Sequence, residues 1–140
     1  MMVNRAQAAA EFLAIVAFFM LVTIPLFAYF YTSAPQKEYY ASLSQAEVAA
    51  SEFVKYGELV GTQANGTNIT RLIVLPKYTT EIVLDGTDAV LHLEYSGMET
   101  DIVRMGAVNF TSKEIRNISG GTYAFVFTNK EGNVYVDIRK

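Results

Sequence analysis

The sequence contains no cysteine and no tryptophan, and among its 140 residues there is one histidine. The absence of cysteine excludes disulfides, thiolate catalysis and cysteine-bound metal centres. The one histidine, His92, lies in the alternating stretch AVLHLEY, where we expect a structural side chain and not a base or a metal ligand. No glycine-rich phosphate loop follows a predicted strand. These absences favour a protein that is not an enzyme and that uses no cofactor and no metal.

Charge is also sparse. From Lys37 onward ten basic residues stand against thirteen acidic ones, which gives this part a net charge of −3. A mildly acidic domain lacks the basic surface that nucleic acid requires. Four carboxylates could gather around calcium, but their spacing fits no known binding loop and aspartate is common in turns, so we interpret them as turn and surface residues: Asp85, Asp88, Glu99 and Asp101.

One long hydrophobic run dominates the chain. Residues 12–36 carry no charge, and a helix of about 25 residues is long enough to cross the roughly 30 Å hydrocarbon core of a bilayer. A secretory signal peptide would have a shorter apolar core. Arg5 lies on the short N-terminal side, so the positive-inside rule predicts that the C-terminal part faces outward.

The helical pattern continues beyond this run. We predict one long helix from Gln7 to about Leu59, with a bend or local loosening at Pro25, where a backbone hydrogen bond is lost. Its second half is amphipathic, and we expect an apolar stripe to pack on a domain and to consist of Tyr40, Leu43, Ala50, Val54 and Gly57.

After a polar loop, Gly61–Asn68, the apolar period changes from 3.6 to 2. Strands are expected at about 69–75, 80–84, 89–95, 100–104, 122–128 and 133–138, with a short one near 107–110. Turns are predicted at Asp85-Gly86, Ser96-Gly97, Gly120-Gly121 and 129–132. The expected fold is therefore α+β, with a long N-terminal helix and a small antiparallel β head, either a sheet or a sandwich.

The residues in front of the hydrophobic run form a pattern that is typical of a known kind of signal peptide. Basic Arg5 and small Ala6 precede Gln7, and Glu11 follows four residues later at the head of the apolar segment. This pattern resembles the class III signal peptide of type IV pilin-like proteins, most closely the archaeal ones. The resemblance implies that a prepilin-type peptidase cuts between Ala6 and Gln7 and leaves the apolar helix on the mature protein.

By this resemblance the chain is a pilin that leaves the membrane and polymerises through its N-terminal helix into a surface filament for adhesion. The implied partners are further copies of the chain, the membrane before assembly, the prepilin peptidase and the assembly machinery, with no nucleic acid. Gln7, Glu11 and Pro25 become assembly residues. The implied organisation is a leader (1–6), a membrane and filament-core helix (7–36), an amphipathic helix (37–60) and an extracellular head (61–140).

Two alternatives remain open at this point. A single-pass membrane-anchored adhesin or binding module would show the same hydrophobic span, but it gives no reason for Gln7 and Glu11. A minor pilin or pseudopilin would show the same motif without forming the main filament. The sequence does not separate the major from the minor subunit.

A second motif is repeated. Asn-x-Ser/Thr occurs four times, and each copy falls in a predicted loop or strand end, where a bulky glycan is tolerated: Asn65, Asn68, Asn109 and Asn117. The plain alternative is that Asn, Ser and Thr are common in turns. For an exported protein we expect at least one of these sites to be glycosylated.

Overall fold

The computed structural model describes the backbone of residues 2–139, and within that range every side chain except those of 2–6, 34 and 35. One helix is followed by five strands: α1 (Met2–Gly61), β1 (Asn68–Leu75), β2 (Thr79–Tyr95), β3 (Met98–Arg116), β4 (Gly121–Lys130) and β5 (Asn133–Arg139). This order confirms the α+β fold.

The chain divides into two compact units, Met1–Glu38 and Tyr39–Lys140, and α1 contributes to both. The first unit is helical throughout its described backbone. The helix continues through Pro25 without interruption, although proline removes one hydrogen bond from the ladder. The second unit, which we call the head, combines the last part of α1 with all five strands.

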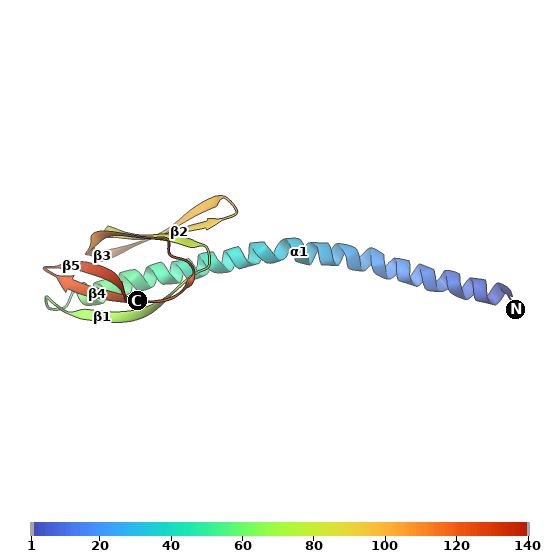
Figure 1. Cartoon of the computed structure of the whole chain (residues 1–140), viewed down its shortest axis with the longest axis horizontal. Helices are drawn as coiled ribbons and strands as arrows, with labels where there is room; N and C mark the ends of the chain where they lie inside the picture. The colour runs from blue at the N-terminus through green and yellow to red at the C-terminus, as the bar shows by residue number, and fades with distance from the viewer. Residues whose placement is uncertain (1, 140) are drawn as a thin grey trace. The chain divides into compact units, whose positions relative to one another are not determined.

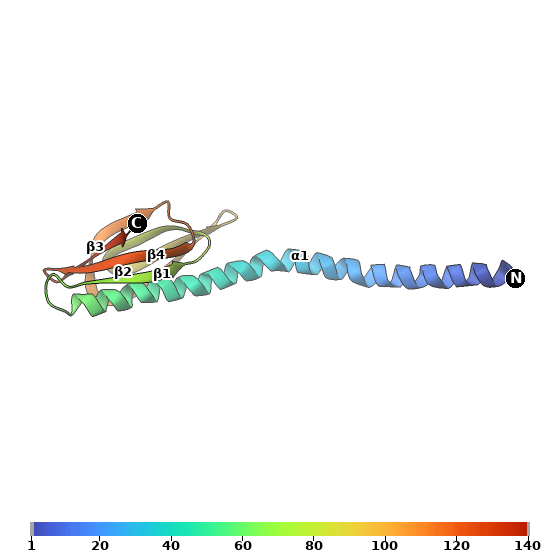
Figure 2. The same cartoon turned by 60° about the horizontal axis from the view of Figure 1, so that its bottom comes forward.

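The head contains one sheet with the strand order β1-β4-β5-β3-β2 (Figure 1). The predicted hairpin of β4 and β5 is confirmed, with Lys130 opposite Asn133 and Phe125 opposite Ile138. The sheet is not wholly antiparallel as expected, because β3 and β5 pair in parallel at Asn109 and Phe110. Figure 2 shows the strands lying along one side of the C-terminal part of α1.

The number of strands differs from the prediction. Two expected strands, 80–84 and 89–95, form the single strand β2, and β3 runs through 100–104 and 107–110 on to Arg116. The expected turn at Asp85-Gly86 is a sharp reversal inside β2. A hydrogen bond between the two ends of this segment shows the reversal, since the Glu94 amide donates to the Tyr78 carbonyl at 2.9 Å. A straight strand would hold these residues about 50 Å apart. Gly86 permits the reversal with a φ of 55°.

The stripe of α1 that packs on the sheet lies beside the predicted one. Tyr40 is exposed, and Leu43 and Val54 are only partly buried at the margin of the core. Ala50 is fully buried as predicted, and the other fully buried side chains of α1 are those of Ala46, Ala49, Phe53 and Val60. The alanines let the helix approach the sheet closely, so that the Phe53 ring reaches the rings of Phe125 and Phe127 at centroid distances of 4.8 and 5.9 Å.

The predicted stripe residue Gly57 is buried for a steric reason. A Cβ at this position would lie 2.4 Å from Cζ of Phe110, whose side chain is itself buried. The glycine therefore makes room for the Phe110 ring at the helix surface. This contact joins α1 to the point where β3 meets β5.

Asn129 joins the end of α1 to the β4–β5 hairpin. Its side-chain amide donates to the carbonyls of Val60, Gly61 and Gln63 at 3.3, 3.3 and 2.8 Å, and its Oδ1 accepts from the Gly132 amide at 3.1 Å. The residue is only 3% exposed. A helix end leaves carbonyls without intrahelical partners, and this one side chain satisfies several of them.

Replacing Asn129 with alanine is expected to lower the free energy of unfolding by about 2–3 kcal/mol, because buried carbonyls lose their donor. The matched control is Asn133→Ala in the same hairpin, since Asn133 bonds to the exposed Asn109 side chain. That change should cost under about 1 kcal/mol. Urea unfolding of the full chain in detergent micelles measures both, and equal losses in the two variants would contradict the capping role of Asn129.

Candidate assembly and processing site

The expected assembly residues Gln7 and Glu11 lie on one face of α1, one turn apart. The Gln7 Nε2 donates to Glu11 Oε1 at 3.3 Å, and both side chains are exposed. The expected processing residues Arg5 and Ala6 belong to the helix, but their side chains lie outside the described residues. Glu11 is therefore a carboxylate at the N-terminal end of the apolar stretch. Among the described residues, its one polar side-chain partner is the neutral amide of Gln7.

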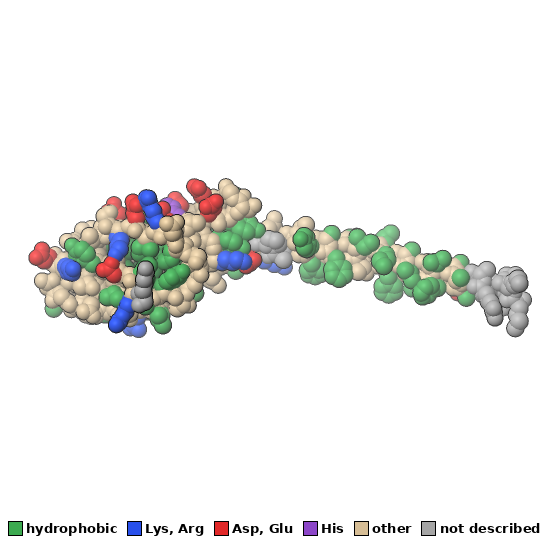
Figure 3. Space-filling view, viewed as in Figure 1, with side chains coloured by type: hydrophobic (Ala, Val, Ile, Leu, Met, Phe, Trp, Pro, Cys, Tyr) green, Lys and Arg blue, Asp and Glu red, His purple; other side chains and the backbone are tan. Residues whose placement is uncertain are grey.

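From Phe12 to Tyr31, α1 is apolar on every side. Large side chains point outward around the whole circumference, and Phe18, Leu21 and Phe27 are 66–71% exposed within their unit. Figure 3 shows hydrophobic side chains along one face of this part of the helix. Among the described residues, α1 holds the one stretch long and apolar enough to cross a membrane. An apolar surface of this kind requires a nonaqueous neighbour, either lipid or other protein.

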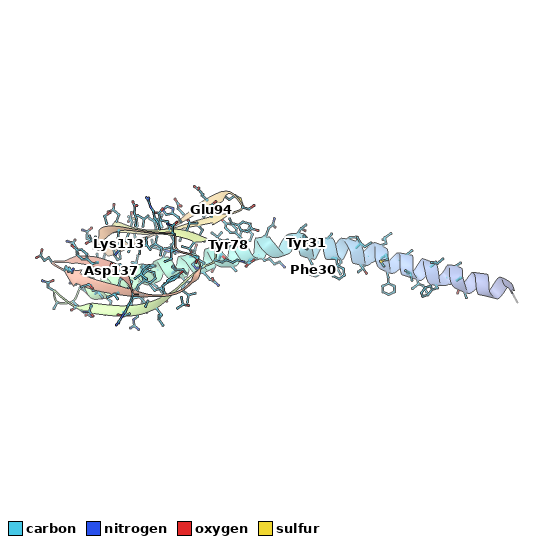
Figure 4. The ribbon with its side chains drawn as sticks, viewed as in Figure 1. Phe30, Tyr31, Tyr78, Glu94, Lys113 and Asp137 are labelled. Carbon is cyan, nitrogen blue, oxygen red and sulfur yellow. The ribbon has the colours of Figure 1, made fainter. Side chains whose placement is uncertain are left out.

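The apolar surface ends in a group of aromatic residues. Tyr29, Phe30 and Tyr31 are 62%, 58% and 85% exposed, and Figure 4 labels the last two on the helix. In the next turn the Thr32 hydroxyl donates back to the carbonyls of Ala28 and Tyr29, at 3.0 and 3.2 Å. Tyrosines with an apolar ring and a polar tip favour the boundary between hydrocarbon and water. From Glu11 to Tyr31 the helix rises about 30 Å.

The four sequons lie on the head, and all four asparagines are exposed. Asn65 and Asn68 lie between α1 and β1 and at the start of β1, and Asn117 follows β3 with a φ of 57°. The prediction that each sequon lies in a loop or at a strand end is wrong for Asn109, which lies inside the long strand β3. Its Nδ2 donates to Asn133 Oδ1 at 2.8 Å.

Acidic side chains, with basic ones among them, lie around the one histidine on the β2–β3 hairpin (Figure 3), where His92 lines a pocket with Glu81, Glu94, Glu99 and Asp101. His92 Nδ1 lies 2.5 Å from Asp101 Oδ1, and the two residues are directly opposite in the ladder. The pairing of His92 with Asp101 follows from the confirmed turn at Ser96-Gly97, which sets this register. Nearby, a hydrogen bond to Glu81 and the charge of Glu114 raise the pKa of Arg116, which is already fully protonated at neutral pH.

Within the described part of the chain, no three acidic or histidine side chains gather in a way that could hold a metal ion. The four carboxylates that the sequence analysis weighed as calcium ligands and interpreted as turn and surface residues, Asp85, Asp88, Glu99 and Asp101, are not brought together as a ligand set. The described residues therefore present two surfaces to partners. One is the apolar stretch of α1, with the Glu11 carboxylate at its N-terminal end, and the other is the surface of the head, with its exposed asparagines. No family model, no curated protein and no solved structure matches this chain.

Proposed function

We propose that this chain is the structural subunit of an archaeal type IV pilus-like filament on the cell surface. The observation that carries the proposal is the stretch of α1 from Phe12 to Tyr31, which is apolar on every side and is preceded by Gln7 and Glu11. A helix of this kind has two stable environments, a bilayer and a bundle of identical helices. A subunit that moves from the first to the second needs such a surface.

The distribution of side-chain sizes supports the bundle. Five alanines, at positions 8, 9, 10, 14 and 17, lie in the first part of the helix, where their small side chains let neighbouring backbones approach closely. Large aromatic and aliphatic side chains lie between and after them, and each can bury substantial area against a neighbour. A lone anchor in lipid gains little from this combination, because lipid adapts to any apolar surface.

The long apolar helix near the N-terminus is compatible with membrane anchoring. In our proposal the newly made protein spans the cytoplasmic membrane with Glu11 near the inner boundary and Tyr29–Tyr31 near the outer one. Cleavage after Ala6 then leaves Gln7 as the first residue of the subunit. The peptidase and the assembly machinery act on this membrane form.

The membrane-anchored adhesin is the second candidate, and the exposed sequons and the folded head suit it equally well. The two differ in one consequence, since only a pilin polymerises. Electron microscopy of cells with and without the gene for this chain, combined with an epitope tag in the head, tests the difference. Tagged filaments along their whole length support the major pilin, tags only at filament tips support a minor pilin, and tagged membranes without filaments reject both.

At least one sequon is expected to carry a glycan in the exported protein. Asn117 is the strongest candidate, because it is exposed at a turn, whereas the Nδ2 of Asn109 already donates to Asn133. The mass of the mature protein should exceed that of its polypeptide, and Asn117→Gln should reduce the excess by one glycan. Asn133→Gln is the control, since Asn133 is not in a sequon. A mature protein with the mass of the bare polypeptide would contradict glycosylation.

A further inference from the structure

Three tyrosines far apart in sequence meet at the first residue of the head. The rings of Tyr39 and Tyr95 stack with centroids 5.0 Å apart and planes 20° apart, and Tyr78 meets both edge-on at 6.4 and 4.8 Å. The hydroxyls of Tyr39 and Thr100 are hydrogen-bonded at 2.7 Å. We call Tyr39, Tyr78, Tyr95 and Thr100 the tyrosine cluster.

The cluster includes a strained residue. Tyr78 has a φ of 79°, in a region that bulky residues rarely adopt. Its carbonyl accepts the hydrogen bond of Glu94, so the unusual backbone is tied to the strand that carries Tyr95 (Figure 4 labels Tyr78 and Glu94). Strain of this kind persists only where surrounding contacts enforce it, and it is common where a contact opens and closes.

The tyrosine cluster contacts α1 before the point where the hydrophobic core begins. Tyr39 is the first residue of the head, and the fully buried core of α1 begins only at Ala46. Between them Ser42 is the one buried side chain, at 4% exposed, whereas Tyr40 is 68% exposed and Leu43 is only partly buried. The cluster therefore holds the first two turns of α1 in the head, separately from the main core.

We propose that the tyrosine cluster is a clasp that opens and closes independently of the head core. When it is closed, the head holds α1 from Tyr39 onward. When it is open, Tyr39 leaves the rings of Tyr78 and Tyr95, and the head holds α1 only from a residue between Ser42 and Ala46 onward. The clasp thus sets how much of α1 is free at the boundary of the head, whether the chain is a pilin or a membrane anchor.

Hydrogen exchange of the full chain in detergent micelles tests this device. Tyr95→Ala removes the stacked partner of Tyr39 from another element, and amides in 39–45 should then exchange on the order of tenfold faster. Amides of β4 and β5 should keep their rates. The matched control is Tyr135→Ala, which removes a partly exposed tyrosine of β5 and should leave 39–45 unchanged.

A second variant covers the case in which Tyr95→Ala fails to fold. Tyr39→Phe keeps the stacked ring and removes only the hydrogen bond to Thr100, so it should accelerate the same amides by a smaller factor. Faster exchange in 39–45 alone, in either variant, supports the clasp. Unchanged exchange in 39–45 would overturn the proposal, because the tyrosine contacts would then not hold this segment. An equal rise throughout β4 and β5 would also overturn it, because the tyrosines would then belong to the head core.

Discussion

Phe53→Ala is expected to lower the free energy of unfolding of the head by about 3–5 kcal/mol, as large-to-small changes of a buried aromatic residue do. Phe53 is fully buried between α1 and the sheet, and its ring meets Phe125 edge-on at 4.8 Å and Phe127 at 5.9 Å. The change removes the transfer free energy of the ring and both aromatic pairs, and it leaves a cavity that the alanines of α1 cannot fill.

The control for this change lies on the same helix. Val48 is 59% exposed, so Val48→Ala should change stability by no more than about 0.5 kcal/mol. Urea unfolding in micelles, followed by the tyrosine signal of the head, measures both variants. If the unfolding midpoint of Phe53→Ala matched that of Val48→Ala, the packing of α1 on β4 would not be what stabilises the head.

The second large effect concerns assembly. Glu11→Gln should leave a processed, membrane-resident protein that is depleted from filaments. In our proposal, cleavage gives Gln7 a new α-amino group one helical turn from Glu11. Inside a bundle of apolar helices this amine, on the same or a neighbouring subunit, is the nearest cation, and an unpaired carboxylate there costs several kcal/mol. A subunit docked at the wrong depth leaves both charges unpaired, so the pair sets the register.

Glutamine keeps the size of Glu11 and its hydrogen bond with Gln7 while it removes the charge. The matched control is Glu52→Gln, a carboxylate of α1 in the head, which should yield normal filaments. Immunoblots of sheared filaments and of membranes give the ratio of assembled to unassembled protein for each variant. Abundant filaments made of Glu11→Gln subunits would reject the register role and leave Glu11 as a first-turn acid favoured by the helix dipole.

The sequence predicted the long helix and the alternating strands because these depend on local spacing. It predicted the helix stripe less well. Leu43 and Tyr40 are larger than Ala46 and Ala49, so hydrophobicity favoured them, but the sheet selects the small residues that allow close approach. Leu43→Ala is therefore expected to cost less than the 2–5 kcal/mol of a fully buried leucine.

Other features depend on contacts between distant residues and leave no local pattern. In the sequence Asn129 is typical of a turn. Its hydrogen bonds to the carbonyls at the end of α1 depend on the pairing of β1 with β4, which the sequence does not indicate. The stacking of Tyr39 on Tyr95 and the parallel pairing of β3 with β5 are of the same kind. By contrast, the site at Gln7 and Glu11 could be proposed from the sequence, because its residues lie one helical turn apart.

The first residue of the mature protein is the most direct test of the account. Surface filaments or outer-surface protein purified from the native cells are analysed by N-terminal sequencing and intact mass. We predict Gln7 as the first residue, with residues 1–6 removed and the apolar helix retained. A mature protein that keeps residues 1–6, or that has lost the apolar helix, would contradict the assignment of this chain as a pilin subunit.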